Sequence, residues 1–292
     1  MRLTLARKFD DETGAAAQLS SAVLFVEGDR HSFVDDSLID RSLTTELDLR
    51  QQPPDHDFGA MAPLVAADAP WEKNCQVGAY SSIHQDTPGG NASLFYQLYC
   101  SKDANGSTAY GADSVAMVAV AQSTDGIHFS KPIVGKIRFR NSTTNNIVML
   151  PPGKVSAMSE LEGCSVFRDP HSGRLTSVAA LGTKLSVWTA LDKYGLEWNL
   201  TARWEVGFDD SQSALFWDHP RSEYALYTRA KSGDTATERS EVRGVRRLPI
   251  RSLDDPGLPA RKNLWDNDFG QTVLMPDAID NATHVRPQRV VP

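Results

Sequence analysis

Three stretches of the chain place carboxylates directly before a run of apolar residues: FVDDSLI (33–39), MSELEGCSV (158–166) and FDDSQSALF (208–216). Their acids are Asp35, Asp36, Glu160, Glu162, Asp209 and Asp210. Two carboxyl groups that face each other across a pocket can act as acid and as base or nucleophile, the pairing that cleavage of a glycosidic bond requires. The alternative for each is an exposed loop acid, and Asp36 is also suited to capping a turn.

Two further residues have side chains suited to contacting a sugar. Gln212 follows Asp210 by two positions, and its amide could bond sugar hydroxyls. Trp71 is the tryptophan that we expect as an exposed platform for stacking on a sugar ring. The histidines lack metal-ligand spacing, and the chain has no phosphate-binding loop or nucleophile elbow. We therefore expect neither a cofactor nor a metal.

Charge and hydropathy limit the partners and the location of the chain. The formal net charge is −7 over 292 residues without a long basic run, which argues against nucleic acid or an anionic membrane as partner. No apolar stretch reaches the ~18 residues of a membrane span, and the N-terminal stretch lacks the apolar core of a signal peptide. N-glycosylation sequons nevertheless begin at Asn91, Asn105, Asn141, Asn199 and Asn281. We expect a monomer in the secretory pathway or outside the cell; the alternative is a cytoplasmic protein with chance sequons.

The elements that must position these residues are short β-rich runs bounded by Gly, Pro, Asn and Asp, which predicts an all-β fold. Three segments repeat one plan, opening with VGAYSSIHQD (77–86), GCSVFRD (163–169) and SQSALFWD (211–218). In each, an apolar strand ends in Asp, two strands follow, and a polar turn precedes a late aromatic. The polar turns around Asp125, Asp192 and Asp254 are 67 and 62 residues apart, about the length of a four-stranded antiparallel blade with its loops. An unrelated β-sandwich is the alternative.

The three cysteines do not form a disulfide framework or a zinc motif. Cys75 and Cys100 fall opposite each other if the chain between them folds as a hairpin, so a cross-strand disulfide is geometrically feasible. Two buried free thiols are the alternative.

Several motifs occur in a recognisable order: FVDDSLID (33–40), APWEKN (69–74), STDGIHFSKP (123–132), NNIV (145–148), SVFRDP (165–170) and DSQSALFWD (210–218). By this order, over residues 22–280, the chain resembles a group of mostly uncharacterised secreted proteins related to the five-bladed β-propellers of glycoside hydrolase families 32 and 43, which are invertase- and arabinanase-like. The resemblance implies a five-bladed β-propeller over residues 22–292 after a disordered segment 1–21. Because three repeats follow one irregular segment at 22–70, we expect the propeller to be incomplete or truncated at its C-terminal end.

The resemblance implies a carbohydrate ligand on the propeller axis, where the innermost strands begin. The Arg-Asp-Pro of invertase-like enzymes begins its strand, whereas Asp169 follows one, so we interpret Asp169 as a turn residue. We expect the acid to be Asp210, with Asp209, Glu160 and Glu162 as other candidates, and Asp35 or Asp36 to be the base or nucleophile. No Glu stands where the family 43 acid is expected. A carbohydrate-binding or scaffold propeller that has lost the acid/base pair is therefore the alternative.

Overall fold

The computed structural model describes residues 63–87, 89–102, 114–152, 161–182, 184–207, 212–231, 243–258 and 270–274. These residues belong to one compact unit, Pro63–Pro292. The predictions made for segment 1–21 and for the irregular segment up to residue 62 fall outside the described residues.

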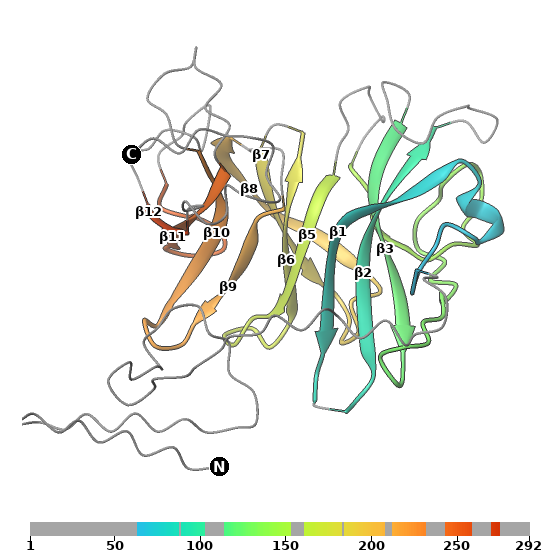
Figure 1. The fold of residues 1–292 in the computed structure, drawn as a ribbon, viewed down its shortest axis with the longest axis horizontal. Helices are drawn as coiled ribbons and strands as arrows, with labels where there is room; N and C mark the ends of the chain where they lie inside the picture. The colour runs from blue at the N-terminus through green and yellow to red at the C-terminus, as the bar shows by residue number, and fades with distance from the viewer. Residues whose placement is uncertain are drawn as a thin grey trace, which may run out of the picture. The chain divides into compact units, whose positions relative to one another are not determined.

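The described part is all-β, with a single turn of 3-10 helix, η2 (Pro70–Glu72), as its helical element. Twelve strands form three four-stranded antiparallel sheets in chain order (Figure 1). Blade 1 holds β1 (Cys75–Gln85), β2 (Ala92–Ser101), β3 (Ser114–Ser123) and β4 (Ile147–Met149). Blade 2 holds β5 (Leu161–Arg168), β6 (Leu175–Leu181), β7 (Lys184–Ala190) and β8 (Trp198–Gly207). Blade 3 holds β9 (Ala214–Asp218), β10 (Glu223–Lys231), β11 (Arg243–Ile250) and β12 (Gln271–Leu274).

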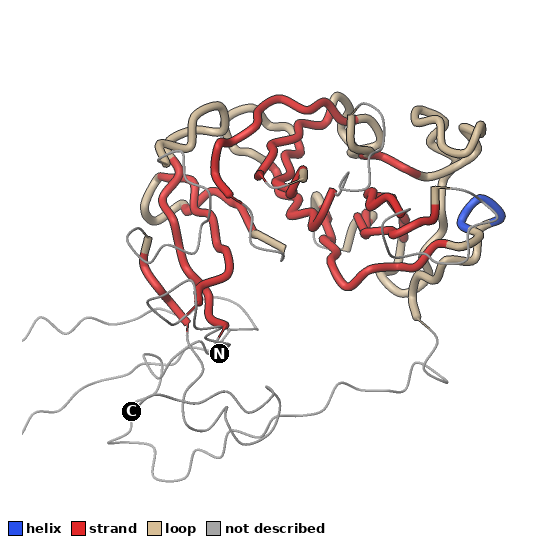
Figure 2. The backbone as a smooth tube through the Cα atoms, turned by 90° about the horizontal axis from the view of Figure 1, so that it is seen from above, coloured by secondary structure: helices blue, strands red, loops and turns tan. Residues whose placement is uncertain are grey.

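The three sheets stand next to one another in the manner of propeller blades, each meeting its neighbour through its first strand. Strand β1 packs against β5, and β5 packs against β9. The same succession of sheets is visible when the unit is viewed from above (Figure 2). The predicted three-fold strand repeat is therefore confirmed, with β1, β5 and β9 as the inner strands.

Apolar side chains fill the space between successive blades. Between blades 1 and 2, Phe95 and Trp198 meet edge to face with ring centroids 5.7 Å apart, within a cluster that includes Val120 and Val166. The core between blades 2 and 3 is built from Val178, Leu185, Val187, Trp204, Leu215, Leu226 and Leu248. Strands buried on both faces are apolar at nearly every position, which explains the continuous run SVAMVAVA in β3.

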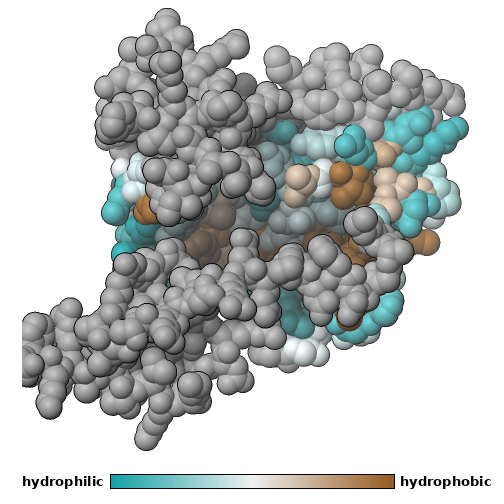
Figure 3. Space-filling model, viewed as in Figure 1, coloured by the Kyte–Doolittle hydropathy of each residue, from teal (hydrophilic) through white to brown (hydrophobic). Residues whose placement is uncertain are grey.

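One face of blade 1 leaves some apolar side chains at the surface. Ile83 on β1 is 60% exposed, and its register partner on β2, Leu94, packs against the core of that face. Figure 3 shows apolar atoms in brown between polar ones in teal in the part of the view where β1 to β3 lie. Isolated exposed apolar residues of this kind are normal on a protein surface and carry no function by themselves.

The predicted polar turns connect the third and fourth strands of each blade. The carboxylate of Asp125 accepts the backbone N–H groups of residues 127 and 128, and that of Asp192 accepts those of residues 194, 196 and 197. In blade 3 the turn residue is Asp255 rather than the expected Asp254. Asp255 accepts the N–H of Gly257 and donates its own N–H to Ser252. The spacing from Ser to Asp is therefore one residue longer here than in blade 1, where Asp125 donates its N–H to Ser123.

Cys75 and Cys100 form a disulfide, which is the first of the two alternatives that the sequence left open. The two residues are direct partners in the β1–β2 ladder, with Cα atoms 4.0 Å apart. The Arg140 guanidinium reinforces this corner by donating to the carbonyl oxygens of Ser101 and Lys73. Burial raises the pKa of the third cysteine, Cys164, to about 12, so its thiol is protonated at neutral pH.

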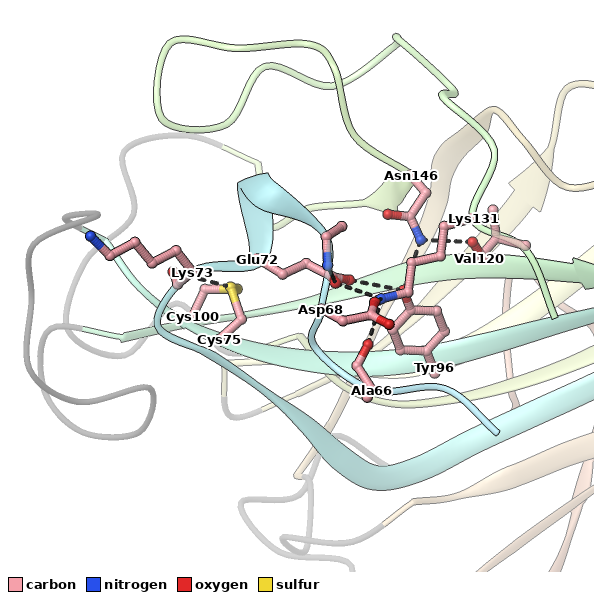
Figure 4. A network of polar contacts seen from close by, with 11 residues as sticks. Ala66, Asp68, Glu72, Lys73, Cys75, Tyr96, Cys100, Val120, Lys131 and Asn146 are labelled. Carbon is pink, nitrogen blue, oxygen red and sulfur yellow. Dashed lines mark hydrogen bonds and ion pairs between the residues drawn. A yellow bond between two sulfur atoms is a disulfide. The ribbon is translucent and has the colours of Figure 1, made fainter. Parts of the chain in front are cut away.

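A buried polar network fixes the segment before β1 on blade 1 (Figure 4). The Lys131 ammonium contacts the Glu72 carboxylate at 2.5 Å and the Asp68 carboxylate at 2.6 Å. Glu72, only 1% exposed, also accepts the hydroxyl of Tyr96 at 3.2 Å. Asn146 donates to that hydroxyl oxygen at 2.7 Å. A buried carboxylate needs such partners, because leaving it unpaired would be costly.

Candidate functional site at the starts of the inner strands

The acid of the Arg-Asp-Pro motif, Asp169, lies at the outgoing end of β5 and caps its hairpin. Its carboxylate accepts the N–H of Ser172 at 2.9 Å and that of His171 at 3.3 Å. Tyr224 of blade 3 donates its hydroxyl to the same carboxylate at 2.7 Å. Burial raises the pKa of Asp169, but the hydrogen bonds from Ser172 and Tyr224 outweigh it and leave the pKa below its ordinary value. These contacts confirm that Asp169 is a turn residue.

The equivalent acids of the other inner strands are paired as well. At the end of β1, the hydrogen bond from His84 and the ion pair with Arg168 hold the pKa of Asp86 below its usual range, although burial opposes them. At the end of β9, Asp218 accepts Arg247 at 2.8 Å, and this contact lowers its pKa. The outgoing acids therefore serve the fold, and the candidate site residues that remain lie at the opposite ends of the strands.

Glu162 is the predicted acid that the described residues include at the strand-start end. It is the second residue of β5 and is 5% exposed. The Tyr99 hydroxyl, which comes from β2 of blade 1, donates to its carboxylate at 3.0 Å. A carboxyl group between two blades at this end is in the position that the sequence predicted for chemistry. Asp35, Asp36, Glu160, Asp209 and Asp210 lie outside the described residues.

Beside Glu162, a buried amide holds β5 against blade 1. Gln97 on β2 is fully buried, and its side chain donates to the carbonyl oxygen of Leu161 and accepts the N–H of Gly163, both at 3.2 Å. One amide thus satisfies two backbone groups on either side of Glu162. The position of the Glu162 backbone is therefore fixed by blade 1 rather than by its own sheet alone.

Gln212 links the three inner strands from its place directly before β9. Its Nε2 donates to the carbonyl oxygens of Cys164 on β5 at 2.9 Å and Ser81 on β1 at 3.3 Å. The approach is close because Gly163 has φ +68°, and a Cβ at that position would lie 3.0 Å from the Cα of Gln212. A ladder irregularity between Glu162 and Ser165 makes room for this contact. With both amide hydrogens used, the carbonyl oxygen is the atom that Gln212 can offer to a ligand.

Two serines, which the sequence reasoning missed, connect the same strands. Ser82 on β1 accepts the N–H of Val166 at 3.0 Å, and Ser165 on β5 accepts the N–H of Leu215 at 3.2 Å. Each serine stands four residues before the acid that ends its strand. This shared spacing was the available signal, and in β9 the same position is Ala214.

Trp71 lies apart from this cluster. In η2 it packs edge to face on Phe139, with ring centroids 6.3 Å apart, and contributes to the apolar cluster of blade 1 that contains Val65 and Tyr96. Its ring is therefore partly covered by protein rather than presented as an open platform.

We call the set Gln97, Tyr99, Glu162, Gly163 and Gln212 the strand-start cluster.

Two hollows of the described part lie at the outgoing ends of the strands, not at the strand-start cluster. One of about 480 Å³ is formed by blade 3 with the β5–β6 hairpin and has His171, Trp217 and Tyr224 in its wall. The other, of about 700 Å³, lies between blades 1 and 2.

Within the described ranges, no group of three or more His, Cys, Asp or Glu residues could hold a metal ion. The described part also contains no helix long and apolar enough to cross a membrane.

Comparisons with known proteins find similar solved structures, whereas no family model and no curated protein matches the chain. A β-fructofuranosidase from Schwanniomyces occidentalis complexed with fructosyl-erythritol is 11% identical, with a TM-score of 0.40 over 63% of this chain and 33% of that one. An α-L-arabinanase from Cellvibrio cellulosa complexed with arabinohexaose is 14% identical, with a TM-score of 0.38 over 69% and 61%. An exo-inulinase from Aspergillus awamori is 12% identical, with a TM-score of 0.35 over 65% and 40%.

The chain thus resembles solved fructofuranosidase, inulinase and arabinanase structures over part of its length, as the sequence motifs predicted. It spans only a third of the length of the fructofuranosidase. At these identities the similarity is one of strand arrangement, and no activity follows from it.

Proposed function

We propose that the chain is a glycoside-hydrolase-like, five-bladed type of β-propeller that hydrolyses or binds a glycan at the strand-start cluster. The observation that carries the proposal is Glu162, a buried carboxyl group at the start of an inner strand, held by Tyr99 beside the inter-strand bridge of Gln212. Fixed carboxyl groups in a largely dry setting are what acid/base cleavage of a glycosidic bond uses.

In this proposal the acid comes from the starts of the second and third inner strands. One acid among Asp210, Asp209, Glu162 and Glu160 protonates the leaving oxygen, and Asp35 or Asp36 activates water or attacks the sugar. The Gln212 carbonyl oxygen accepts a sugar hydroxyl. Trp71 packs in blade 1, away from the strand-start cluster, so we propose it only as a sugar contact outside that cluster.

A non-catalytic carbohydrate-binding or scaffold propeller is the second candidate. The burial of Glu162 favours it, since a carboxyl group that is 5% exposed and already bonded to Tyr99 can serve the fold alone. In either case we propose an extracellular or secretory-pathway monomer. The sequon residues that the structure describes, Asn91, Asn141 and Asn199, are all exposed, which suits this location.

The test is a glycosidase and binding screen on the full chain with aryl glycosides and neutral oligosaccharides. For a hydrolase, either Glu162→Gln or Asp210→Asn, whichever removes the acid, should lower kcat by ~10²–10⁴-fold. Glu205→Gln is the matched control. Glu205 lies on β8 and is exposed, where it pairs with Lys184 of β7, so its replacement should leave the rate unchanged.

The outcomes separate the two candidates. Saturable glycan binding without turnover, weakened by Gln212→Ala, identifies the binding propeller. Neither turnover nor binding across the screen would contradict both forms of the proposal.

A further inference from the structure

The 700 Å³ groove between blades 1 and 2 has the chemistry of a sugar site, although it lies at the end of the blades opposite the strand-start cluster. Its volume falls within the ~300–1,000 Å³ of small-molecule sites. Leu175 and Leu196 supply apolar surface. Hydroxyls and amides form much of the remaining wall, among them Ser93, Gln122, Ser123, Thr124 and Ser130.

The charged groups of this groove are largely paired within the protein, which favours a neutral ligand over an ionic one. Asp86 is bonded to His84 and Arg168. His128 is bonded to Asp125 at 2.6 Å. These pairs leave hydroxyl, amide and aromatic surface, together with the Lys193 ammonium, as the means of recognition.

An exposed aromatic ring stands in the wall contributed by blade 2. Tyr194 is 56% exposed and lines the groove together with Lys193, whose Nζ lies 5.6 Å from the ring centroid. An exposed aromatic ring of this kind offers surface on which a sugar can stack. The turn that carries it is fixed, because Asp192 accepts the N–H groups of Tyr194 and Leu196. The backbone that carries the ring is therefore held within the protein itself.

The opposing wall, from blade 1, carries a residue to which a sugar can be attached. Asn91 lines the same groove, is exposed, and begins the sequon Asn91-Ala92-Ser93. The β1–β2 connection that presents it is tied down by Gln85, whose side chain donates to the Gly90 carbonyl oxygen at 2.6 Å. A glycan on Asn91 would start inside the groove rather than project from a convex surface.

We propose that Asn91 carries an N-linked glycan whose first N-acetylglucosamine residues lie in this groove and stack on Tyr194. In the transfer, the Asn91 amide nitrogen bonds to the anomeric carbon of a lipid-linked oligosaccharide and loses one proton. The bond from that carbon to the diphosphate oxygen breaks, and the lipid diphosphate leaves. The glycan then joins blade 1 to blade 2, a structural role independent of any chemistry at the strand-start cluster. The inference shares with the proposed function only the passage through the secretory pathway.

The test is the rate at which an endoglycosidase cuts between the first two sugars, measured for each site by glycopeptide mass spectrometry. The full chain is secreted from a glycosylating host behind a fused leader. The glycan on Asn91 should be cut at least 10-fold more slowly in the native protein than after denaturation. The exposed sites Asn141 and Asn199, which do not line the groove, should show less protection.

Substitution of the ring provides the second arm. Tyr194→Ala should remove most of the protection at Asn91, whereas Leu191→Ala, on the same turn and 53% exposed, should not. An unmodified Asn91, native trimming as fast as denatured trimming, or protection unchanged in Tyr194→Ala would each overturn the inference. None of these results depends on whether the protein hydrolyses glycans.

Discussion

Replacing Lys131 by methionine tests the buried network of Figure 4 most sharply, because it removes the ammonium while keeping the aliphatic stem. Glu72, whose side chain is fully buried, would keep the Tyr96 hydroxyl and the N–H of Ala69 but lose its charged partner. Breaking a buried pair in this way costs ~3–5 kcal/mol. The Asp68 carboxylate is 73% exposed, so its contact adds at most ~1 kcal/mol.

We expect a loss of about 3 kcal/mol in the free energy of unfolding, at the lower end of that range because two neutral hydrogen bonds to Glu72 remain. If the described blades unfold as one unit, Tm falls by ~6–12 °C. Urea denaturation followed by tryptophan fluorescence measures the free energy. Lys184→Met is the matched control, since Lys184 and Glu205 form an exposed pair worth less than ~1 kcal/mol.

A double variant makes the reasoning stricter. Adding Glu72→Gln to Lys131→Met removes the uncompensated buried charge, so the double variant should lose less than the sum of the two single variants. If Lys131→Met costs no more than Lys184→Met, or if the losses simply add, the network does not hold the segment before β1 in the way described.

Three further predictions follow from single contacts. Gly163→Ala should destabilise the protein more than Gly126→Ala in chemical denaturation. Both glycines have positive φ, but of the two only Gly163 has a neighbour within 4 Å of the new Cβ. Equal losses of stability would refute this. Asp169→Asn should be less stable than the parent at neutral pH. The difference in the free energy of unfolding should be complete above about pH 5 and vanish as pH falls through the depressed pKa of Asp169. Denaturation measured at a series of pH values would contradict this if the difference did not change with pH. Reducing the Cys75–Cys100 disulfide should cost ~3.5 kcal/mol for a 25-residue separation, and an unchanged Tm under reductant would refute this.

The parts of the fold that depend on short-range rules could be predicted from sequence. Asp125, Asp192 and Asp169 bond backbone groups two to five residues away, so their turn roles are visible in the local pattern. The three repeats followed from the spacing of these turns. The hairpin between Cys75 and Cys100 made their disulfide feasible but left two free thiols as the alternative.

The contacts between blades could not be predicted in this way. Ser82 meets Val166 across 84 residues, and Gln212 meets Ser81 across 131, so no local pattern determines them. The partners of Gln212 depend on the close approach at Gly163, and the burial of Trp71 depends on Phe139. The sequence indicated that Glu162 lies at the start of an inner strand, but the hydroxyl that holds it, from Tyr99, comes from a neighbouring blade.

The most direct test of the central claim is the distance between the carboxyl group of the proposed acid, Glu162 or Asp210, and that of the proposed base or nucleophile, Asp35 or Asp36, in a crystal structure of the full chain with a bound sugar. Our account predicts ~5–10 Å, with the sugar between the two groups at the starts of the inner strands. A separation above about 15 Å, or a sugar bound elsewhere with both carboxyl groups on the rim, would contradict it.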